Sequence, residues 1–203
     1  MTETPVDPDP PDAAFHTQGV DHITIWGSNE EDTIAFYRDV LGMPLVLRQP
    51  NLDDPEQTHL FFDTGDGRIL TVFVSDERDS ADRQRGQTGA VHHLSFTIAA
   101  EDFQDIMDAL DERDRHYNVF DRGIFTSLYT QDNNGLVIEL SADRYEIPND
   151  RRGEVLAKTQ EIRKADGADY AEDDHLRQAL DDLGIEIVEH DLPDAATGVG
   201  VED

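Results

Sequence analysis

The 203-residue sequence contains no cysteine and only two lysines, Lys158 and Lys164. The absence of cysteine excludes disulfides, thiolate metal sites and cysteine nucleophiles. Basic residues are scarce as a class, because 16 lysines and arginines stand against 46 acidic residues and leave a net charge of −30. A surface of this sign repels phosphate backbones and anionic membranes, which argues against nucleic-acid or membrane partners.

The acidity admits two interpretations, disorder or adaptation to salt. Disordered chains have few hydrophobic residues, whereas Phe, Ile, Leu and Val are plentiful between residues 19 and 142. Acidic, lysine-poor surfaces suit concentrated salt, because screening removes their self-repulsion. We therefore expect a folded protein from a salt-loving organism such as a haloarchaeon, which loses structure in dilute buffer.

Long apolar runs are also lacking, so no stretch has the length of a membrane span. The first residues, MTETPVDPDPPDAAF, are acidic and rich in proline, with neither the basic nor the apolar region of a signal peptide. We expect residues 1–15 to form a disordered tail and the protein to be cytoplasmic.

An internal repeat dominates the rest of the chain. GVDHITIW (19–26) and AVHHLSFT (90–97) align without gaps, which places His22 opposite His93. Each stretch reads as a strand that precedes a helical pattern, with Ser28 or Asn29 as the first helix's N-cap. Three strand-like runs follow each helix, at 44–49, 58–63 and 68–75 and at 117–121, 124–130 and 135–142.

The repeat predicts an α+β fold of two βαβββ modules, at about 18–76 and 89–142, within a domain spanning 16–145. We expect the two modules to pair their sheets around a shared, metal-centred cavity. Residues 146–203 lie outside the repeat and predict a C-terminal extension of two helices with an acidic tail, which would serve as a cover or an oligomer contact. His175 and His190 in this extension are expected at the surface.

Three residues at related positions of the repeat could hold a metal. Glu139 lies in GLVIELS, and a carboxylate among apolar strand residues is costly unless it is paired or metal-bound. His22 and His93 also have apolar neighbours. A satisfied core histidine or a solvated glutamate explains any one of them, but all three together favour a site. Two imidazoles and a carboxylate bind a divalent metal and leave several coordination positions open.

Successive residues of a strand point to opposite faces, so His92 and His93 cannot serve one site in the same way. His93 matches His22 and is the expected ligand. His92 either forms a hydrogen bond on the outer face or supports the site.

The segments DHITIW, FYRDVLGMPLV, VHHLSF and QDNNGLVIEL resemble the vicinal-oxygen-chelate superfamily over roughly residues 18–145. This superfamily includes glyoxalase I, bleomycin-resistance proteins, fosfomycin-modifying enzymes, methylmalonyl-CoA epimerase and extradiol ring-cleaving dioxygenases. Thr71 occupies the position at which glyoxalase I and the epimerase take a further ligand, so the resemblance implies a site with three protein ligands.

FDRGIFTSLYTQDNNGLVIELSAD resembles the catechol and hydroquinone ring-cleaving branch. Arg122, Tyr129 and Glu139 keep that branch's intervals of seven and ten residues. The resemblance implies catalytic roles for Tyr129, which would hydrogen-bond oxygen or substrate and help proton transfer, and for Arg122, which would stabilise an anion or bind a substrate carboxylate. The alternatives are a tyrosine at the core edge and an ion-paired surface arginine.

Two departures from this branch affect the predicted mechanism. Asp21 stands where the branch often has a second histidine. If that histidine is an acid–base group, either Asp21 or His92 replaces it here or the activity differs. Many relatives also carry four modules rather than two, so the cavity closes either within one chain or in a homodimer. His59 is expected to line the cavity, and Phe61 and Phe73 to belong to its wall or to the core.

The function favoured by the sequence is an extradiol-type dioxygenase that cleaves a dihydroxylated aromatic ring with dioxygen. The resemblance implies Fe(II), with Mn(II) or another divalent metal as the alternative. A glyoxalase I-like lyase or fosfomycin-type thiol transferase is the second candidate. A non-catalytic binding protein of the bleomycin-resistance kind is the third, although such proteins usually lack the metal ligands.

Overall fold

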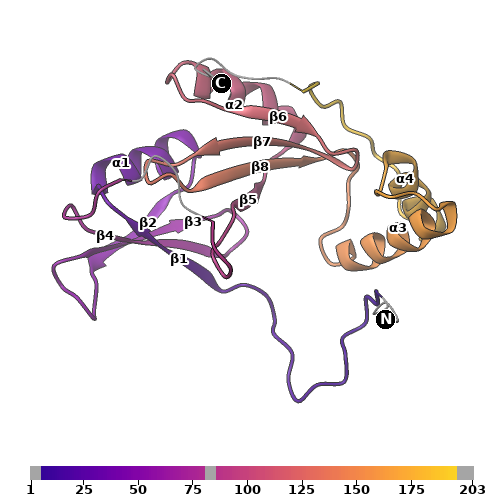
Figure 1. Cartoon of the computed structure of the whole chain (residues 1–203), viewed down its shortest axis with the longest axis horizontal. Coiled ribbons are helices and arrows are strands. Elements are labelled where there is room, and N and C mark those ends of the chain that lie inside the picture. Colours follow the sequence, from indigo (N-terminus) through magenta and orange to yellow (C-terminus); the bar gives the residue numbers. More distant parts are fainter. Residues whose placement is uncertain (1–5, 81–85, 196–203) are drawn as a thin grey trace.

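The computed structural model describes residues 6–80 and 86–195 and contains the two predicted βαβββ modules (Figure 1). The first module consists of β1 (His22–Gly27), α1 (Glu30–Ile34) with a π-helical continuation (Ala35–Val40), β2 (Leu45–Pro50), β3 (Thr58–Asp63) and β4 (Ile69–Val74). The second consists of β5 (Leu94–Thr97), a 3-10 turn (Ala100–Asp102), α2 (Phe103–Asp111), β6 (Asn118–Asp121), β7 (Phe125–Gln131) and β8 (Val137–Asp143).

Each module forms its own four-stranded sheet with the same topology. The strand orders are β1-β4-β3-β2 and β5-β8-β7-β6, and in each sheet the first strand pairs in parallel with the last. Asn29 caps α1, because its side chain accepts a hydrogen bond from the backbone N–H of Asp32. Gly42, at φ +71°, turns the chain out of the first helix. The α+β fold class predicted from the repeat is confirmed.

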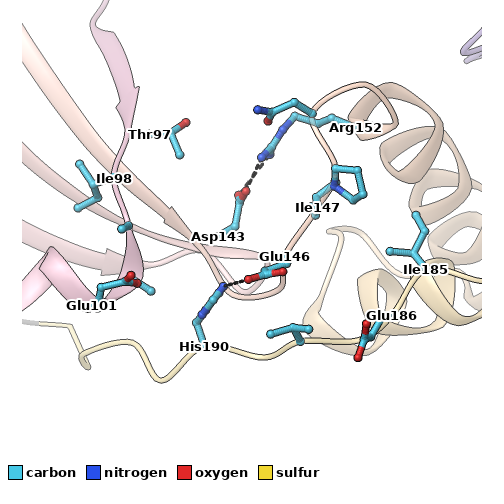
Figure 2. A pocket seen from close by; sticks show the side chains of 15 residues that line it. Thr97, Ile98, Glu101, Asp143, Glu146, Ile147, Arg152, Ile185, Glu186 and His190 are labelled. Atoms are coloured by element: carbon cyan, nitrogen blue, oxygen red, sulfur yellow. Dashed lines mark hydrogen bonds and ion pairs between the residues drawn. The ribbon is translucent and has the colours of Figure 1, made fainter. Parts of the chain in front are cut away.

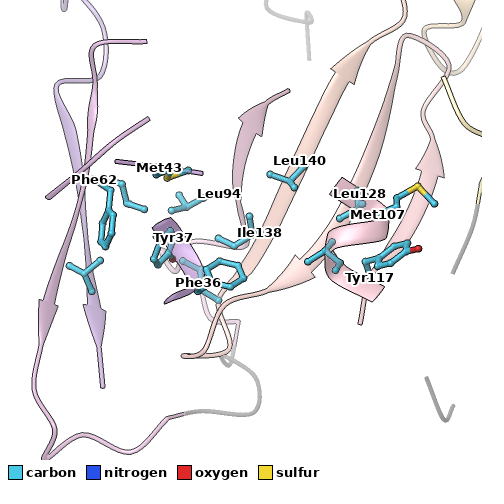
Figure 3. Packing of buried hydrophobic residues seen from close by; sticks show 14 of the residues in the cluster. Phe36, Tyr37, Met43, Phe62, Leu94, Met107, Tyr117, Leu128, Ile138 and Leu140 are labelled. Carbon is cyan, nitrogen blue, oxygen red and sulfur yellow. The ribbon is translucent and has the colours of Figure 1, made fainter. Parts of the chain in front are cut away.

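A single hydrophobic core joins the two modules (Figure 3). Phe36 and Tyr37 on the first module's helix pack between the two sheets, with Phe62 on one side and Ile138 on the other. Because strand side chains alternate, His22 and Glu139 lie on the faces directed away from this core.

Buried polar contacts fix how the modules pack. The hydroxyl of Tyr37 donates to Asp132 at 2.9 Å, and the backbone N–H of Ser28 donates to the side-chain oxygen of Asn134, also at 2.9 Å. Asp132 and Asn134 belong to the turn between β7 and β8, so this turn docks onto the first module. The carboxylate of Asp132 also accepts a hydrogen bond from the backbone N–H of Leu136 at 2.8 Å, which stabilises the turn itself.

The C-terminal extension contains the two predicted helices, α3 (Arg152–Asp166) and α4 (Asp173–Asp182). They pack on Tyr145 around a small separate core, beyond one end of the second sheet (Figure 1). His175 is only 6% exposed, and its Nδ1 accepts the N–H of Glu172 at the start of α4. The prediction of a surface histidine was therefore wrong here, because the ring caps its own helix. None of the helices in the described ranges is long and apolar enough to cross a membrane.

Candidate functional site

Glu139 occupies the centre of the second sheet, where it pairs with Ser95 of β5 and with Tyr129 of β7. Its side chain is buried, with the residue 5% exposed. One carboxylate oxygen, Oε1, accepts hydrogen bonds from the hydroxyls of Ser127 at 2.5 Å and Tyr129 at 2.7 Å. The other oxygen, Oε2, lies 2.9 Å from Nε2 of His93. One oxygen is thus satisfied by the protein, while the other is paired with an imidazole nitrogen that is itself a metal-binding atom.

The hydrogen bonds keep this carboxylate ionised. Burial by itself raises the pKa of Glu139, but hydrogen bonds from Ser127, Tyr129 and Ser95 and the charge of a protonated His93 bring it below its usual value. Burial and the bond to Glu139 raise the pKa of Tyr129, so its hydroxyl keeps the proton that it donates. A metal requires the deprotonated carboxylate that this arrangement favours.

The two adjacent histidines precede β5 rather than lying within it, since that strand begins at Leu94. Nδ1 of His92 lies 2.8 Å from Nδ1 of His93, so the two rings share one hydrogen bond. This contact holds the His93 ring with Nε2 toward Glu139. A partner on the far nitrogen that orients the ring is the usual arrangement for a metal-binding histidine.

The other predicted ligand, His22, begins β1 on the first sheet. Its Nδ1 lies 2.6 Å from a carboxylate oxygen of Asp21, which leaves Nε2 as the nitrogen available to a metal. On the neighbouring strand Thr71 is 1% exposed, and its hydroxyl donates to that of Thr24 at 2.8 Å. Because Thr71 is buried, its hydroxyl is not accessible to a metal as a fourth ligand.

Within one chain the structure does not bring His22 to the other two predicted ligands. The described residues contain no group of three His, Cys, Asp or Glu side chains that could hold a metal ion. The shared core explains the separation, because His22 and Glu139 occupy sheet faces on its opposite sides. A single chain thus presents two candidate half-sites, one at His22 and one at His93 with Glu139, and these are called the half-sites below.

Arg122 lies beside the Glu139 half-site. Its guanidinium carbon is 4.8 Å from the ring centroid of Phe120 and 5.6 Å from that of Tyr129. The Tyr129 ring in turn contacts the His93 ring edge-on, with centroids 5.8 Å apart. The arginine, tyrosine and glutamate predicted from their spacing therefore lie in one cluster with the histidine predicted from the repeat.

Sequence reasoning missed the two serines that support Glu139. Ser95 and Ser127 lie on the same sheet face as the carboxylate, and only the alternation of the neighbouring strands could have indicated them. His59 was expected to line the cavity without a partner. Its ring packs against Phe61 and Phe73, and its Nε2 is buried without a hydrogen-bond partner.

A separate hollow of about 650 Å³ lies between the second sheet and the C-terminal extension (Figure 2). The ion pairs Arg152–Asp143 and His190–Glu146 cross it. None of the predicted ligands lines this hollow, and its arginine and its histidine are each paired with one of its carboxylates. We therefore place the candidate site at the two half-sites instead.

The model of the Glyoxalase/Bleomycin resistance protein/Dioxygenase superfamily matches residues 19–140, the two modules together. The chain belongs to this superfamily. Both half-sites lie within the matched range, and the C-terminal helices lie outside it.

Named relatives are more distant. The provisionally named ring-cleaving dioxygenase MhqA of Bacillus subtilis (strain 168) is 26% identical over 131 residues, which cover 64% of this chain and 41% of MhqA. The provisionally named ring-cleaving dioxygenase MhqE of the same organism is 34% identical over 79 residues, 37% of this chain and 26% of MhqE. The matched segments thus span less than half of either relative.

Solved structures agree on the fold. A provisionally described dioxygenase from Bacillus subtilis subsp. subtilis str. 168 superposes with a TM-score of 0.54 at 24% identity, covering 64% of this chain and 42% of that one. A glyoxylase/bleomycin resistance protein/dioxygenase domain from Frankia sp. EAN1pec gives 0.54 at 16% identity, covering 64% and 94%. At these identities the similarity shows the fold alone.

Proposed function

We propose that this superfamily member is a metal-dependent, extradiol-type dioxygenase that opens a catechol or hydroquinone ring with dioxygen. The observation that carries the proposal is the cluster at Glu139, where the carboxylate oxygen and Nε2 of His93 lie 2.9 Å apart beside Tyr129 and Arg122. The names of the Mhq relatives support the same reaction class. Fe(II) is the proposed metal, with Mn(II) as the alternative.

The metal site is proposed to form between two copies of the chain. His22 of one copy would complete the half-site that His93 and Glu139 build in the other, because the shared core keeps His22 away from these two residues within a chain. In a two-fold symmetric dimer this exchange creates two identical sites. The proposed active form is therefore a homodimer.

The donor set fits a divalent first-row metal, since two neutral imidazoles and one carboxylate leave positions open for substrate. The bound metal would lower the pKa of a phenolic hydroxyl and hold diol and dioxygen together. Asp21 and His92 occupy the far nitrogens of His22 and His93 and so orient these rings. Because Asp21 and His92 are hydrogen-bonded to these rings, neither residue is well placed to act as the acid–base group.

Two residues of the chain act on the substrate in this proposal. Tyr129, whose hydroxyl keeps its proton, would donate a hydrogen bond to the diol or to oxygen and take part in proton transfer. Arg122, over the Tyr129 ring, would stabilise negative charge as it develops on the opened ring. Tyr129 contacts Glu139 directly, and Arg122 lies beside the Tyr129 ring.

The two other candidate functions fit less well. A lyase of the glyoxalase I kind would need a further ligand, and the buried, hydrogen-bonded Thr71 does not supply one. A non-catalytic binding protein has no need for a buried carboxylate whose one oxygen is fixed by two hydroxyls.

Oxygen consumption tests the proposed reaction. The full-length chain is reconstituted with Fe(II) under anaerobic conditions in concentrated KCl and mixed with oxygenated catechols, hydroquinones and their carboxylated forms. We expect oxygen uptake together with a new ring-opened chromophore for at least one of them. Bound metal without uptake on any member would rule out the dioxygenase assignment.

Replacing Tyr129 by phenylalanine should slow turnover by about 10²-fold or more while leaving the metal bound, because a proton donor is lost and no ligand is. Steady-state oxygen uptake and metal analysis on the same sample measure both effects. Tyr170→Phe is the matched control, since Tyr170 is 80% exposed and belongs to the C-terminal extension. Turnover equal to that of the control would remove Tyr129 from the mechanism.

A further inference from the structure

The turn between β6 and β7 carries Arg122, one of the two residues proposed to act on the substrate. This turn, residues 121–124, lies at the end of the second sheet that faces α4 (Figure 1). Arg122 itself is exposed, and its guanidinium rests over the Tyr129 ring. Exposed connections are the more mobile parts of a fold, so the position of Arg122 depends on what holds this turn.

Arg144, which directly follows β8, holds the turn through its side chain and its backbone. Its Nε donates to the backbone oxygen of Gly123 at 2.7 Å, and a terminal nitrogen donates to the Asp121 carboxylate at 3.1 Å. The backbone N–H of Arg144 donates to the oxygen of Ile124 at 3.2 Å. The Arg144 side chain is only 22% exposed, and hydrogen bonds that are partly shielded from water are strengthened. One arginine thus fixes the residues on both sides of Arg122.

The C-terminal extension completes this arrangement. Nε of Arg144 lies 3.8 Å from a carboxylate oxygen of Asp173, the first residue of α4. A Cβ placed on Gly123 would lie 3.7 to 3.8 Å from the backbone of residues 171–173, so the turn contacts the start of this helix. Ile124 packs against the small core of the extension. We call these contacts between the turn, Arg144 and the extension the Arg144 link.

The Arg144 link also engages the carboxylate that neighbours Arg122 in sequence. Oδ1 of Asp121 accepts the N–H of Gly123 at 2.7 Å, and Oδ2 accepts the bond from Arg144. Among the residues that the structure describes, no carboxylate lies within ion-pair distance of Arg122. In a chain with 46 acidic residues, this leaves a positive charge available to an anionic group of a ligand.

We propose that Arg144 is a positioning residue, through which the C-terminal extension holds Arg122 over the Tyr129 ring with its charge unpaired. Arg144 does not touch the substrate in this proposal. The ordering of the turn stands on the contacts alone, whereas its benefit to catalysis rests on the proposed function, in which Arg122 stabilises negative charge on the opening ring. The superfamily model ends at residue 140, so neither Arg144 nor the extension belongs to the part that it matches.

Hydrogen exchange tests the Arg144 link without metal, substrate or turnover. The full-length wild type and Arg144→Gln are labelled with deuterium in concentrated KCl, and peptides that cover residues 121–124 are compared by mass spectrometry. The N–H groups of Arg122 and Gly123 are both hydrogen-bonded within the turn. We expect them to exchange about tenfold faster in Arg144→Gln, because the turn opens more readily without the link.

Arg163→Gln is the matched control. Arg163 lies in the same extension and, like Arg144, donates to backbone oxygens, those of Ala168 at 2.6 Å and Asp169 at 3.0 Å. These oxygens belong to the segment after α3, so the control should leave exchange at residues 121–124 unchanged. Wild-type exchange in Arg144→Gln, or an equal increase in Arg163→Gln, would overturn the proposal.

Kinetics on a diol that supports oxygen uptake connects the Arg144 link to Arg122. Arg122→Gln should lower kcat about 10²-fold, the effect of removing a donor to developing negative charge. Arg144→Gln should lower kcat about tenfold and change KM less than about threefold, because the charge develops only during the reaction.

The double variant Arg122→Gln/Arg144→Gln should be no slower than Arg122→Gln alone, since the effect of Arg144 passes through Arg122. A merely structural role would reduce kcat independently. Losses that multiply to about 10³-fold in the double variant would therefore overturn the proposal.

Arg144→Lys provides a second variant that retains the positive charge beside Asp121 and Asp173. The lysine ammonium lacks the planar fork that bonds to two acceptors at once, so exchange at residues 121–124 should be about threefold faster than in the wild type. If Arg144→Gln does not fold, this variant decides the matter. Wild-type exchange and wild-type kcat in Arg144→Lys would then overturn the proposal.

The two kinds of measurement separate this proposal from the dioxygenase assignment. Faster exchange in Arg144→Gln without oxygen uptake by the wild type on any diol supports the Arg144 link and contradicts the reaction. Oxygen uptake by the wild type with unchanged exchange in Arg144→Gln overturns the positioning role and leaves the reaction standing.

Discussion

Replacing Glu139 by alanine is expected to remove nearly all bound metal from the protein. The substitution deletes the charged ligand and leaves two imidazoles, which on their own hold a divalent ion far more weakly. We expect metal content after anaerobic Fe(II) loading and desalting to fall to about a tenth or less of the wild-type value, since losing even a group that only orients a ligand costs 10–100-fold in affinity.

Alanine also disturbs the fold, so a second variant is needed. Ser127 is fully buried and its hydroxyl donates to Glu139, so the alanine variant leaves that hydroxyl without its partner at a cost of about 1–3 kcal/mol. Glu139→Gln keeps an acceptor for Ser127 and Tyr129 but removes the charge. It should keep the thermal midpoint close to wild type and still lose the metal.

Glu146→Ala controls for the removal of one negative charge from an acidic protein. The side chain of Glu146 is 63% exposed and lies in the C-terminal extension, outside the candidate site. Its metal content should equal that of the wild type. Full metal content in Glu139→Gln would show that this carboxylate is not a ligand, whatever its effect on stability.

Much of the fold could be predicted from the sequence, because the strands show alternating apolar and polar residues and the βαβββ unit occurs twice. The strand at 58–63 was predicted with the bounds that β3 has, and Ile138 and Leu140 face the core as their alternation with Glu139 indicated. Asn29 was one of two candidate caps and proved to be the cap. Strand bounds, strand faces and helix caps depend on residues that are close in sequence, so a single sequence is enough to predict them.

The relation between the half-sites could not be read in this way. It depends on how the modules pack, and Tyr37 with Asp132 and Ser28 with Asn134 decide that through contacts about 100 residues apart in sequence. Neither pair has a periodic pattern. The same limit applied to His175, whose burial follows from a cap on its own helix that the hydrophobic pattern does not reveal.

If the metal site is shared between two chains, two inactive variants should restore activity when they form a heterodimer. His22→Ala and Glu139→Gln should each lack metal and oxygen uptake when purified alone, because every site in either homodimer misses one ligand. Co-expression of the two chains with different affinity tags, followed by purification over both tags, isolates the heterodimer. One of its sites combines the intact His22 of one chain with the intact His93 and Glu139 of the other.

This heterodimer should therefore recover about half of the wild-type metal content and oxygen uptake per dimer, because exchange across a two-fold axis restores one site and leaves the other without two ligands. The control is a doubly tagged dimer in which both chains carry Glu139→Gln, and it should recover nothing. A site within one chain predicts the opposite result, since each chain would lack a ligand of its own site and pairing could not restore it. A heterodimer as inactive as the control would contradict the shared site, and metal retained by His22→Ala alone would exclude His22 as a ligand.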